Sequence, residues 1–243
     1  MKKLVVMMTL ALGAGSFGVA HAGIVGSAHD FSDNISVLGG NVAIDENSAS
    51  GWNGRKEICR VCHVPHDHAR ASQRYLNGLL WNHDVSSATY TMYDKTWSST
   101  LGGVQSTQPD GTAKLCLGCH DGSVAIDAFD KYANSITPIF ADAYSKDAKV
   151  TNFSDAGNID LRGTHPLSIQ FPVGDAQFND PATQTWTGGG TVASTLDNGK
   201  VQCSTCHDVH NQESIAGTHL LRAGQTVATG GVASGLCLTC HIK

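Results

Sequence analysis

One short pattern occurs four times in the sequence: two cysteines separated by two residues and followed at once by a histidine. The copies span residues 59–63, 116–120, 203–207 and 237–241, and together they use all eight cysteines of the 243-residue chain. C-x-x-C-H is the attachment signature of c-type haem. Residues i, i+3 and i+4 share one face of a helical turn, so two thiols can bond the haem vinyl groups while the imidazole meets the iron. The sequence therefore predicts four covalent c-type haems.

Two other interpretations of eight cysteines are a disulfide framework and a pair of four-thiolate zinc sites. Neither gives a reason for histidine after every cysteine pair, so haem attachment is preferred. The predicted attachment residues are Cys59, Cys62, Cys116, Cys119, Cys203, Cys206, Cys237 and Cys240, and the predicted proximal iron ligands are His63, His120, His207 and His241.

Histidine is also the expected second axial ligand. Once residues 1–22 are removed, Met92 is the only methionine left, so at most one iron can be bound by His and Met. We expect six-coordinate bis-His irons of low potential, because methionine ligation is what raises the potential. His66 and His210 each follow a proximal histidine by three residues and must serve a neighbouring haem. The predicted distal ligands are His29, His66, His83, His165 and His210, five candidates for four positions, whereas His68 and His219 are interpreted as non-ligands.

Residues 1–22 have the pattern of a removable export signal. Lys2 and Lys3 precede an apolar stretch that ends in Ala20-His21-Ala22, a small-x-small cleavage pattern. We expect an exported mature chain from Gly23, extracellular or on the cell surface, with the periplasm or a retained N-terminal anchor as alternatives. No later run approaches the length needed for a membrane span. The mature chain has 14 basic and 21 acidic residues, a net charge of −7, which argues against nucleic-acid binding.

The predicted fold class is a multihaem cytochrome c. We expect mostly irregular loop, short α-helices at the haem motifs and over 123–132, and few short strands, one within 167–173, built around a haem stack. Aromatic residues are only 7% of the chain, so the haems would supply much of the apolar core. C-x-x-C-H-x-x-H followed by C-x-x-C-H occurs twice, which predicts pseudo-repeats over about 23–145 and 146–243 within one tetrahaem domain, 23–243.

The predicted function is electron transfer, and the protein is not expected to be an enzyme. Four haems on so short a chain must lie close together, and saturated bis-His irons leave no open position for a substrate. A multihaem reductase subunit is the alternative that would need one five-coordinate iron.

Several short elements accompany the motifs, at residues 27–32, 62–66, 81–83, 119–122, 164–166 and 240–243. With the motifs, they resemble the exported tetrahaem cytochromes with doubled C-x-x-C-H motifs, most of all the OmcE-type extracellular cytochromes. The resemblance spans the mature chain, although these elements are short. It implies a continuous haem stack and self-association into a conducting filament that passes electrons to other cytochromes or external acceptors.

The resemblance also implies that one distal histidine comes from the adjacent subunit. On this sequence, His29 or His66 would reach the neighbour's iron. The alternative is a monomeric periplasmic tetrahaem shuttle, in which residues 23–58 fold over the chain's own haem.

Overall fold

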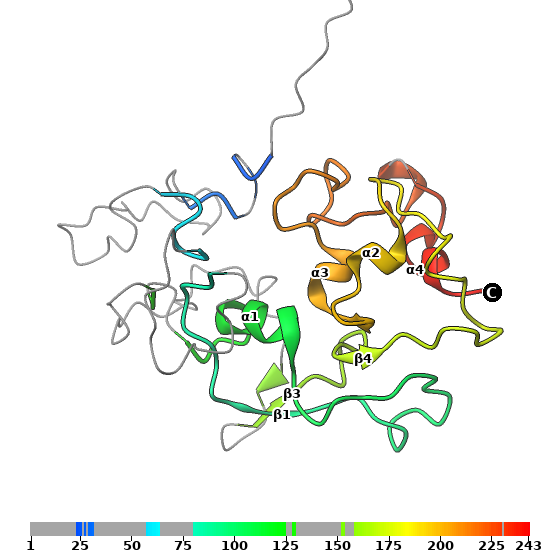
Figure 1. Ribbon diagram of the computed structural model, residues 1–243, viewed down its shortest axis with the longest axis horizontal. Helices are drawn as coiled ribbons and strands as arrows, with labels where there is room; N and C mark the ends of the chain where they lie inside the picture. The colour runs from blue at the N-terminus through cyan, green and yellow to red at the C-terminus, as the bar shows by residue number, and fades with distance from the viewer. Residues whose placement is uncertain are drawn as a thin grey trace, which may run out of the picture.

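A computed structural model describes residues 23–25, 27, 29–31, 57–63, 80–124, 128–129, 152–153, 158–229 and 231–243 (Figure 1). The predicted export signal lies outside these residues. The helices are α1 (Gly111–His120), α2 (Val192–Thr195), α3 (Cys203–Cys206) and α4 (Gly235–Cys240), with a 3-10 turn, η3 (Val227–Thr229). The strands are β1 (Thr89–Thr91), β2 (Asn152–Phe153), β3 (Asn158–Asp160), β4 (Ile169–Gln170) and β5 (Lys200–Val201). Within the described ranges, no helix has the length and apolar character needed to cross a membrane.

Three of the four helices lie on C-x-x-C-H motifs. α1 ends at His120, α3 runs from the first to the second cysteine of the third motif, and α4 ends at Cys240. The first motif forms turns instead of the predicted helix. Pro65 follows closely in the sequence, and proline disfavours a helical backbone at the residue before it.

The helix predicted over 123–132 is also not seen where the structure describes that segment. Residues 123–124 form a bend, and Phe129 forms an isolated bridge with His83. Gly122 has a φ of +78°, the left-handed conformation that ends a helix, directly after the cap residue Asp121. This glycine stops α1 and turns the chain away from its axis.

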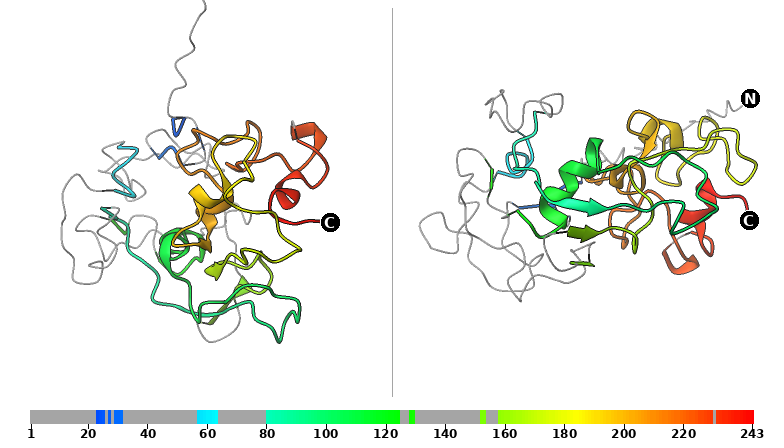
Figure 2. Two further views of the ribbon diagram at one scale, coloured as in Figure 1. Left: turned by 45° about the vertical axis from the view of Figure 1, so that its right-hand side comes forward. Right: turned by 90° about the horizontal axis from the view of Figure 1, so that it is seen from below.

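Two small sheets connect distant parts of the chain. β1 pairs in parallel with β3, with Tyr90 opposite Ile159, and β2 pairs antiparallel with β3. β4, which lies inside the predicted 167–173 strand, pairs antiparallel with β5. Figure 2 shows β1 and β3 beside α1 from two directions. The first sheet therefore joins the two predicted pseudo-repeats.

The larger apolar cluster also draws on both pseudo-repeats. Its buried members are Tyr90, Met92, Ala113, Leu117, Ile159, Leu161 and Leu167. A second cluster lies under α2 and contains Phe171, Trp186, Val192 and Ala223. Because residues from both pseudo-repeats share the first cluster, the halves do not form two separate lobes.

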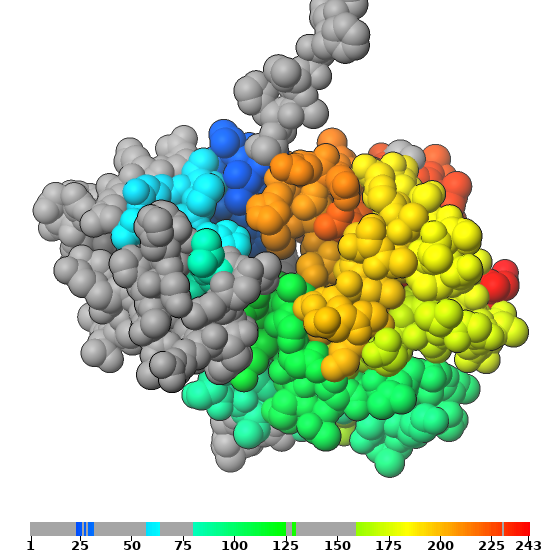
Figure 3. Space-filling view, in the orientation of Figure 1, coloured from blue at the N-terminus to red at the C-terminus, as the bar shows by residue number. Residues whose placement is uncertain are grey.

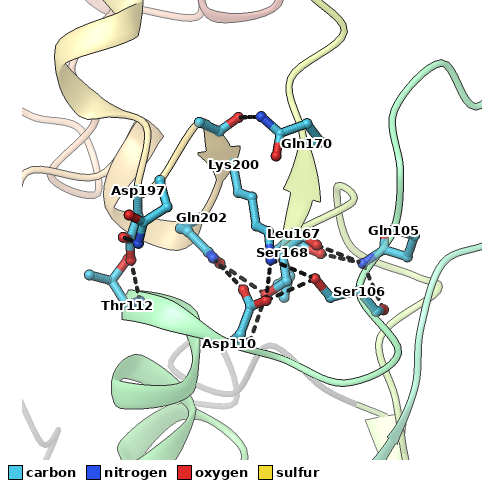
Figure 4. A network of polar contacts seen from close by, with 12 residues as sticks. Gln105, Ser106, Asp110, Thr112, Leu167, Ser168, Gln170, Asp197, Lys200 and Gln202 are labelled. Carbon is cyan, nitrogen blue, oxygen red and sulfur yellow. Dashed lines mark hydrogen bonds and ion pairs between the residues drawn. The ribbon is translucent and has the colours of Figure 1, made fainter. Parts of the chain in front are cut away.

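A polar network ties the start of α1 to β4, β5 and α3 (Figure 4). The Asp110 carboxylate accepts hydrogen bonds from Ser106 Oγ at 2.8 Å and Gln202 Nε2 at 2.9 Å, and it pairs with Lys200. Ser168 Oγ accepts from the Asp110 backbone N–H at 3.0 Å and donates to Gln202 Oε1 at 3.0 Å. The network thus fixes the helix of the second motif against the helix of the third.

Replacing Asp110 with Asn should weaken this junction in a pH-dependent way. Burial would raise the pKa of Asp110, but the hydrogen bonds of the network and the charge of Lys200 bring it below its usual value of 3.8. A carboxyl with a lowered pKa stabilises the fold above its unfolded pKa and loses that contribution as the pH falls. We expect Asp110→Asn to lower the free energy of unfolding by about 1 kcal/mol at pH 7.

Denaturant titrations at pH 7 and pH 3 check this prediction. The difference between Asp110→Asn and the parent protein should shrink at the lower pH. Asp175→Asn is the control, since Asp175 is a half-buried loop residue whose side chain accepts only a local bond from the Gln177 N–H among the bonds described. An equal difference at both pH values would contradict the account.

Candidate haem-binding sites

In all four motifs, the backbone makes one tight turn from the first cysteine to the histidine. The histidine N–H donates to the carbonyl of the first cysteine at 2.7 Å in the first motif, 3.0 Å in the third and 2.9 Å in the fourth. The second motif lies wholly within α1. This i to i+4 bond places both thiols and the imidazole on one side of a single turn, even where no helix continues. Each motif therefore has the local geometry that haem attachment requires.

The cysteines of successive motifs lie close to one another in the order of the sequence. Cys62 lies near enough to Cys119 of the second motif, and Cys203 near enough to Cys116, for each pair to interact electrostatically. Cys206 in turn interacts with both cysteines of the fourth motif, Cys237 and Cys240. The four attachment turns thus form a row in which each neighbours the next.

None of the eight cysteines forms a disulfide. Burial is the largest cause that raises the pKa of Cys62 and Cys119, in each case to about 12, so these thiols are protonated at neutral pH. Among the described residues, no group of three or more Cys, His, Asp or Glu side chains could hold a metal ion.

Three proximal histidines each face one of the predicted distal histidines. The ring centres of His29 and His120 are 6.0 Å apart, those of His63 and His210 are 6.2 Å apart, and those of His165 and His241 are 6.3 Å apart. A metal lies about 2 Å from an imidazole nitrogen, so ring centres on opposite sides of one metal are separated by about 6 Å. The spacing of all three pairs therefore fits the two axial positions of an iron.

The angles between the paired rings are compatible with this interpretation. They are 81°, 26° and 64° for the pairs at His120, His63 and His241. Each ring can turn about its own bond to the metal without losing that bond, so axial ligation does not require parallel rings. The interplanar angles therefore do not indicate that any one of the three pairs is less suited to bind a metal than the others.

His29 lies in surroundings that suit a metal ligand. Burial, and then the charge of His120, lower its pKa to about 4, so the imidazole is neutral at physiological pH. Its Nδ1 is buried and has no hydrogen-bond partner. Segment 23–31 reaches this place between residues 57–63 and the second half of the chain (Figure 3), and Asn211 Nδ2 donates to the Gly23 carbonyl at 2.7 Å. A buried imidazole without a partner is unfavourable unless something binds it.

Several histidines have their Nδ1 fixed by a backbone carbonyl. His207 Nδ1 bonds the His219 carbonyl at 2.7 Å, and His165 Nδ1 bonds the Pro166 carbonyl at 2.9 Å. A carbonyl only accepts, so Nδ1 carries the proton and Nε2 keeps its lone pair. This is the arrangement by which proteins orient metal-ligating histidines.

Of the two remaining predicted ligands, His83 and His66, only His83 lies within the described residues. Among the described residues, His207 makes no ring contact with another imidazole, although it interacts electrostatically with His29, His120 and His219. His83 is fully buried, with Nδ1 bonded to the Asp84 carbonyl at 2.8 Å and Nε2 3.6 Å from Cys119 Sγ, which places it beside the second motif. His66 and His68 lie outside the described residues. Met92, the one alternative axial ligand, packs in the apolar cluster of β1 and α1.

Sequence reasoning missed the acidic residues that directly follow two proximal histidines. Asp121 is fully buried, and its carboxylate accepts hydrogen bonds from Tyr90 Oη at 2.5 Å and the Ser123 N–H at 2.7 Å. Asp208 follows His207 and lies beside Arg222, with an N···O distance of 3.8 Å. The shared Cys-His-Asp pattern of the second and third motifs was the signal that could have identified both.

Comparison with models of protein families and with curated proteins finds no match for this chain. Its functional assignment therefore depends on its own residues and their arrangement.

Intact-mass spectrometry tests whether the motifs carry haem. The protein, expressed with its export signal in a host that attaches c-type haem, should have the mass of its polypeptide plus four haem groups after denaturation, because thioether bonds survive unfolding. Cys237→Ser/Cys240→Ser should carry one haem fewer, and His219→Ala should keep four. A measured mass equal to that of the polypeptide alone, or of the polypeptide with its cysteines joined only in disulfides, would contradict haem attachment.

Proposed function

We propose that this protein carries four covalent c-type haems with bis-His ligation and transfers electrons along them. The observation that carries the proposal is the spacing of three imidazole pairs, each joining a C-x-x-C-H histidine to a histidine far away in the sequence. Haem supplies reversible one-electron iron chemistry when it is bound. The residues of this chain would hold the four haems and orient their histidine ligands.

The row of attachment turns supports electron transfer in particular. Each motif lies beside the next in sequence order, and the Asp110 network holds the second against the third. A fixed row of this kind would keep the bound groups at constant short separations. One electron would enter at one end and one would leave at the other, with no bond made or broken.

The imidazole pairs follow the doubled pattern of the sequence. In each pseudo-repeat, the histidine that precedes the first motif faces the histidine of the second motif: His29 faces His120, and His165 faces His241. His210, three residues after the proximal histidine of the third motif, faces His63 in the other pseudo-repeat. His66 holds the position equivalent to His210, so we assign to it the iron at His207.

We further propose that the protein polymerises into an extracellular conductive filament in which His66 ligates the His207 iron of a neighbouring subunit. Two observations support a bond between subunits. His207 makes no ring contact with another imidazole within the described ranges, and His29, the other residue proposed to reach a neighbour, already faces His120. A head-to-tail contact of this kind produces a filament when its rotation does not close into a ring. The monomeric periplasmic shuttle is the competing outcome.

Single substitutions of the distal histidines test the ligation. Removing one axial imidazole leaves a five-coordinate or weakly ligated iron, so His29→Ala and His165→Ala should each convert one of four low-spin ferric irons to a high-spin form. Electron paramagnetic resonance of the oxidised protein measures this conversion. His219→Ala is the matched control, since His219 is interpreted as a non-ligand and the variant keeps the backbone carbonyl that bonds His207 Nδ1. Fully low-spin spectra in both His29→Ala and His165→Ala would refute the pairing.

Electron microscopy of haem-containing material from the medium or sheared from cells tests the filament. The parent protein should form thin filaments of uniform width, and His66→Ala should give dispersed particles with one high-spin iron per chain. His68→Ala is the control, because His68 is interpreted as a non-ligand and should still polymerise. Dispersed particles from the parent protein, retained in the periplasm, would support the shuttle and refute the filament.

A further inference from the structure

One segment of the chain folds back over the third motif. Residues 219–222 run beside 206–208: the Arg222 N–H donates to the Cys206 carbonyl at 2.9 Å, and the Asp208 N–H donates to the Leu220 carbonyl at 2.8 Å. The His219 carbonyl fixes His207 Nδ1 from the same segment. The side chains of this segment are therefore held against the proximal side of the third motif.

The Arg222 guanidinium lies in the centre of this contact, with only 13% of its side chain exposed. Its Nε donates to the carbonyl of Ser204, between the two cysteines of the motif, at 3.3 Å. Its Nη1 donates to Glu213 Oε2 at 2.5 Å, and its Nη2 lies 3.8 Å from Asp208 Oδ1. One buried cation thus sits between the attachment turn and two carboxylates.

The Asp208 carboxylate is held by backbone donors, whereas the Glu213 carboxylate, whose side chain is 44% exposed, is held by Arg222. Asp208 Oδ2 accepts from the N–H groups of Gln212 and Glu213, each at 2.6 Å, and the Asp208 side chain is 7% exposed. Gly188 packs directly on this loop, since a Cβ there would lie 1.6 Å from the Glu213 carbonyl oxygen. We call Asp208, Glu213 and Arg222 the charge triad.

We propose that the charge triad sets the reduction potential of the haem attached at Cys203 and Cys206, with Arg222 as the residue that raises it. This inference rests on the proposed function, because it concerns a haem on the third motif. Reduction lowers the charge of an iron centre by one, so a nearby fixed cation stabilises the reduced form and a carboxylate the oxidised form. Charges buried in protein are screened much less than charges in water.

Charge substitutions in the triad test the proposal with spectroelectrochemical titration of the full-length, haem-loaded protein. Arg222→Gln should make one of the four midpoint potentials more negative, by at least a tenfold change in that haem's reduction equilibrium, about 59 mV for one electron. Glu213→Gln should shift the same component to more positive potential. The double variant Arg222→Gln/Glu213→Gln restores the net charge of the triad and should return the component toward its parent value.

Two further variants separate charge from structure. Arg222→Lys keeps the cation and should leave the potential near that of the parent. Arg162→Gln removes an arginine that pairs with Asp160 and stacks on Trp97, and it should leave all four potentials unchanged. Shifts of the same sign in Arg222→Gln and Glu213→Gln, or no shift in Glu213→Gln, would overturn the inference. A parent protein without haem absorption bands would instead overturn the proposed function.

Discussion

In the proposed function, the arrangement of this protein depends on the pairing of imidazoles that are far apart in the sequence. His63 and His210 are separated by most of the chain, yet their rings lie 6.2 Å apart. In the proposed function, a metal between them would act as a cross-link that closes a very long loop, and long loops gain the most from such closure. The same holds for His29 with His120 and His165 with His241. The irregular fold is then the consequence of satisfying these links, because the chain needs only short helices at the attachment turns.

Packing between the two pseudo-repeats also brings the C-x-x-C-H motifs close together. The parallel pairing of β1 with β3, the shared apolar cluster around Tyr90 and Ile159, and the Asp110 network all join the first half to the second. As a result, the second and third attachment turns lie beside one another although 87 residues separate their histidines. The doubled sequence is thus folded into one body, and the row of motifs runs through it without a break between halves.

The compact turn at each C-x-x-C-H motif could be predicted from the sequence because its geometry is local, whereas haem attachment at these turns stays a prediction. The sequence also marked His29, His165 and His210 as special, but it could not pair them, because pairing depends on contacts between segments tens of residues apart. The helix expected at the first motif is wrong, since residues 58–62 form turns. Arg222 could not be identified from the sequence at all, since its place beside the third motif depends on how residues 206–208 and 219–222 pair.

The central claim is that each iron lies between two particular imidazoles. A structure of the haem-loaded protein at a resolution that locates iron, by anomalous diffraction or by electron cryo-microscopy of the assembled material, tests it most directly. The account predicts iron between His29 and His120, between His63 and His210, and between His165 and His241 of one chain. Irons bound by other histidine pairs, or a chain that folds this way and holds no iron, would contradict it.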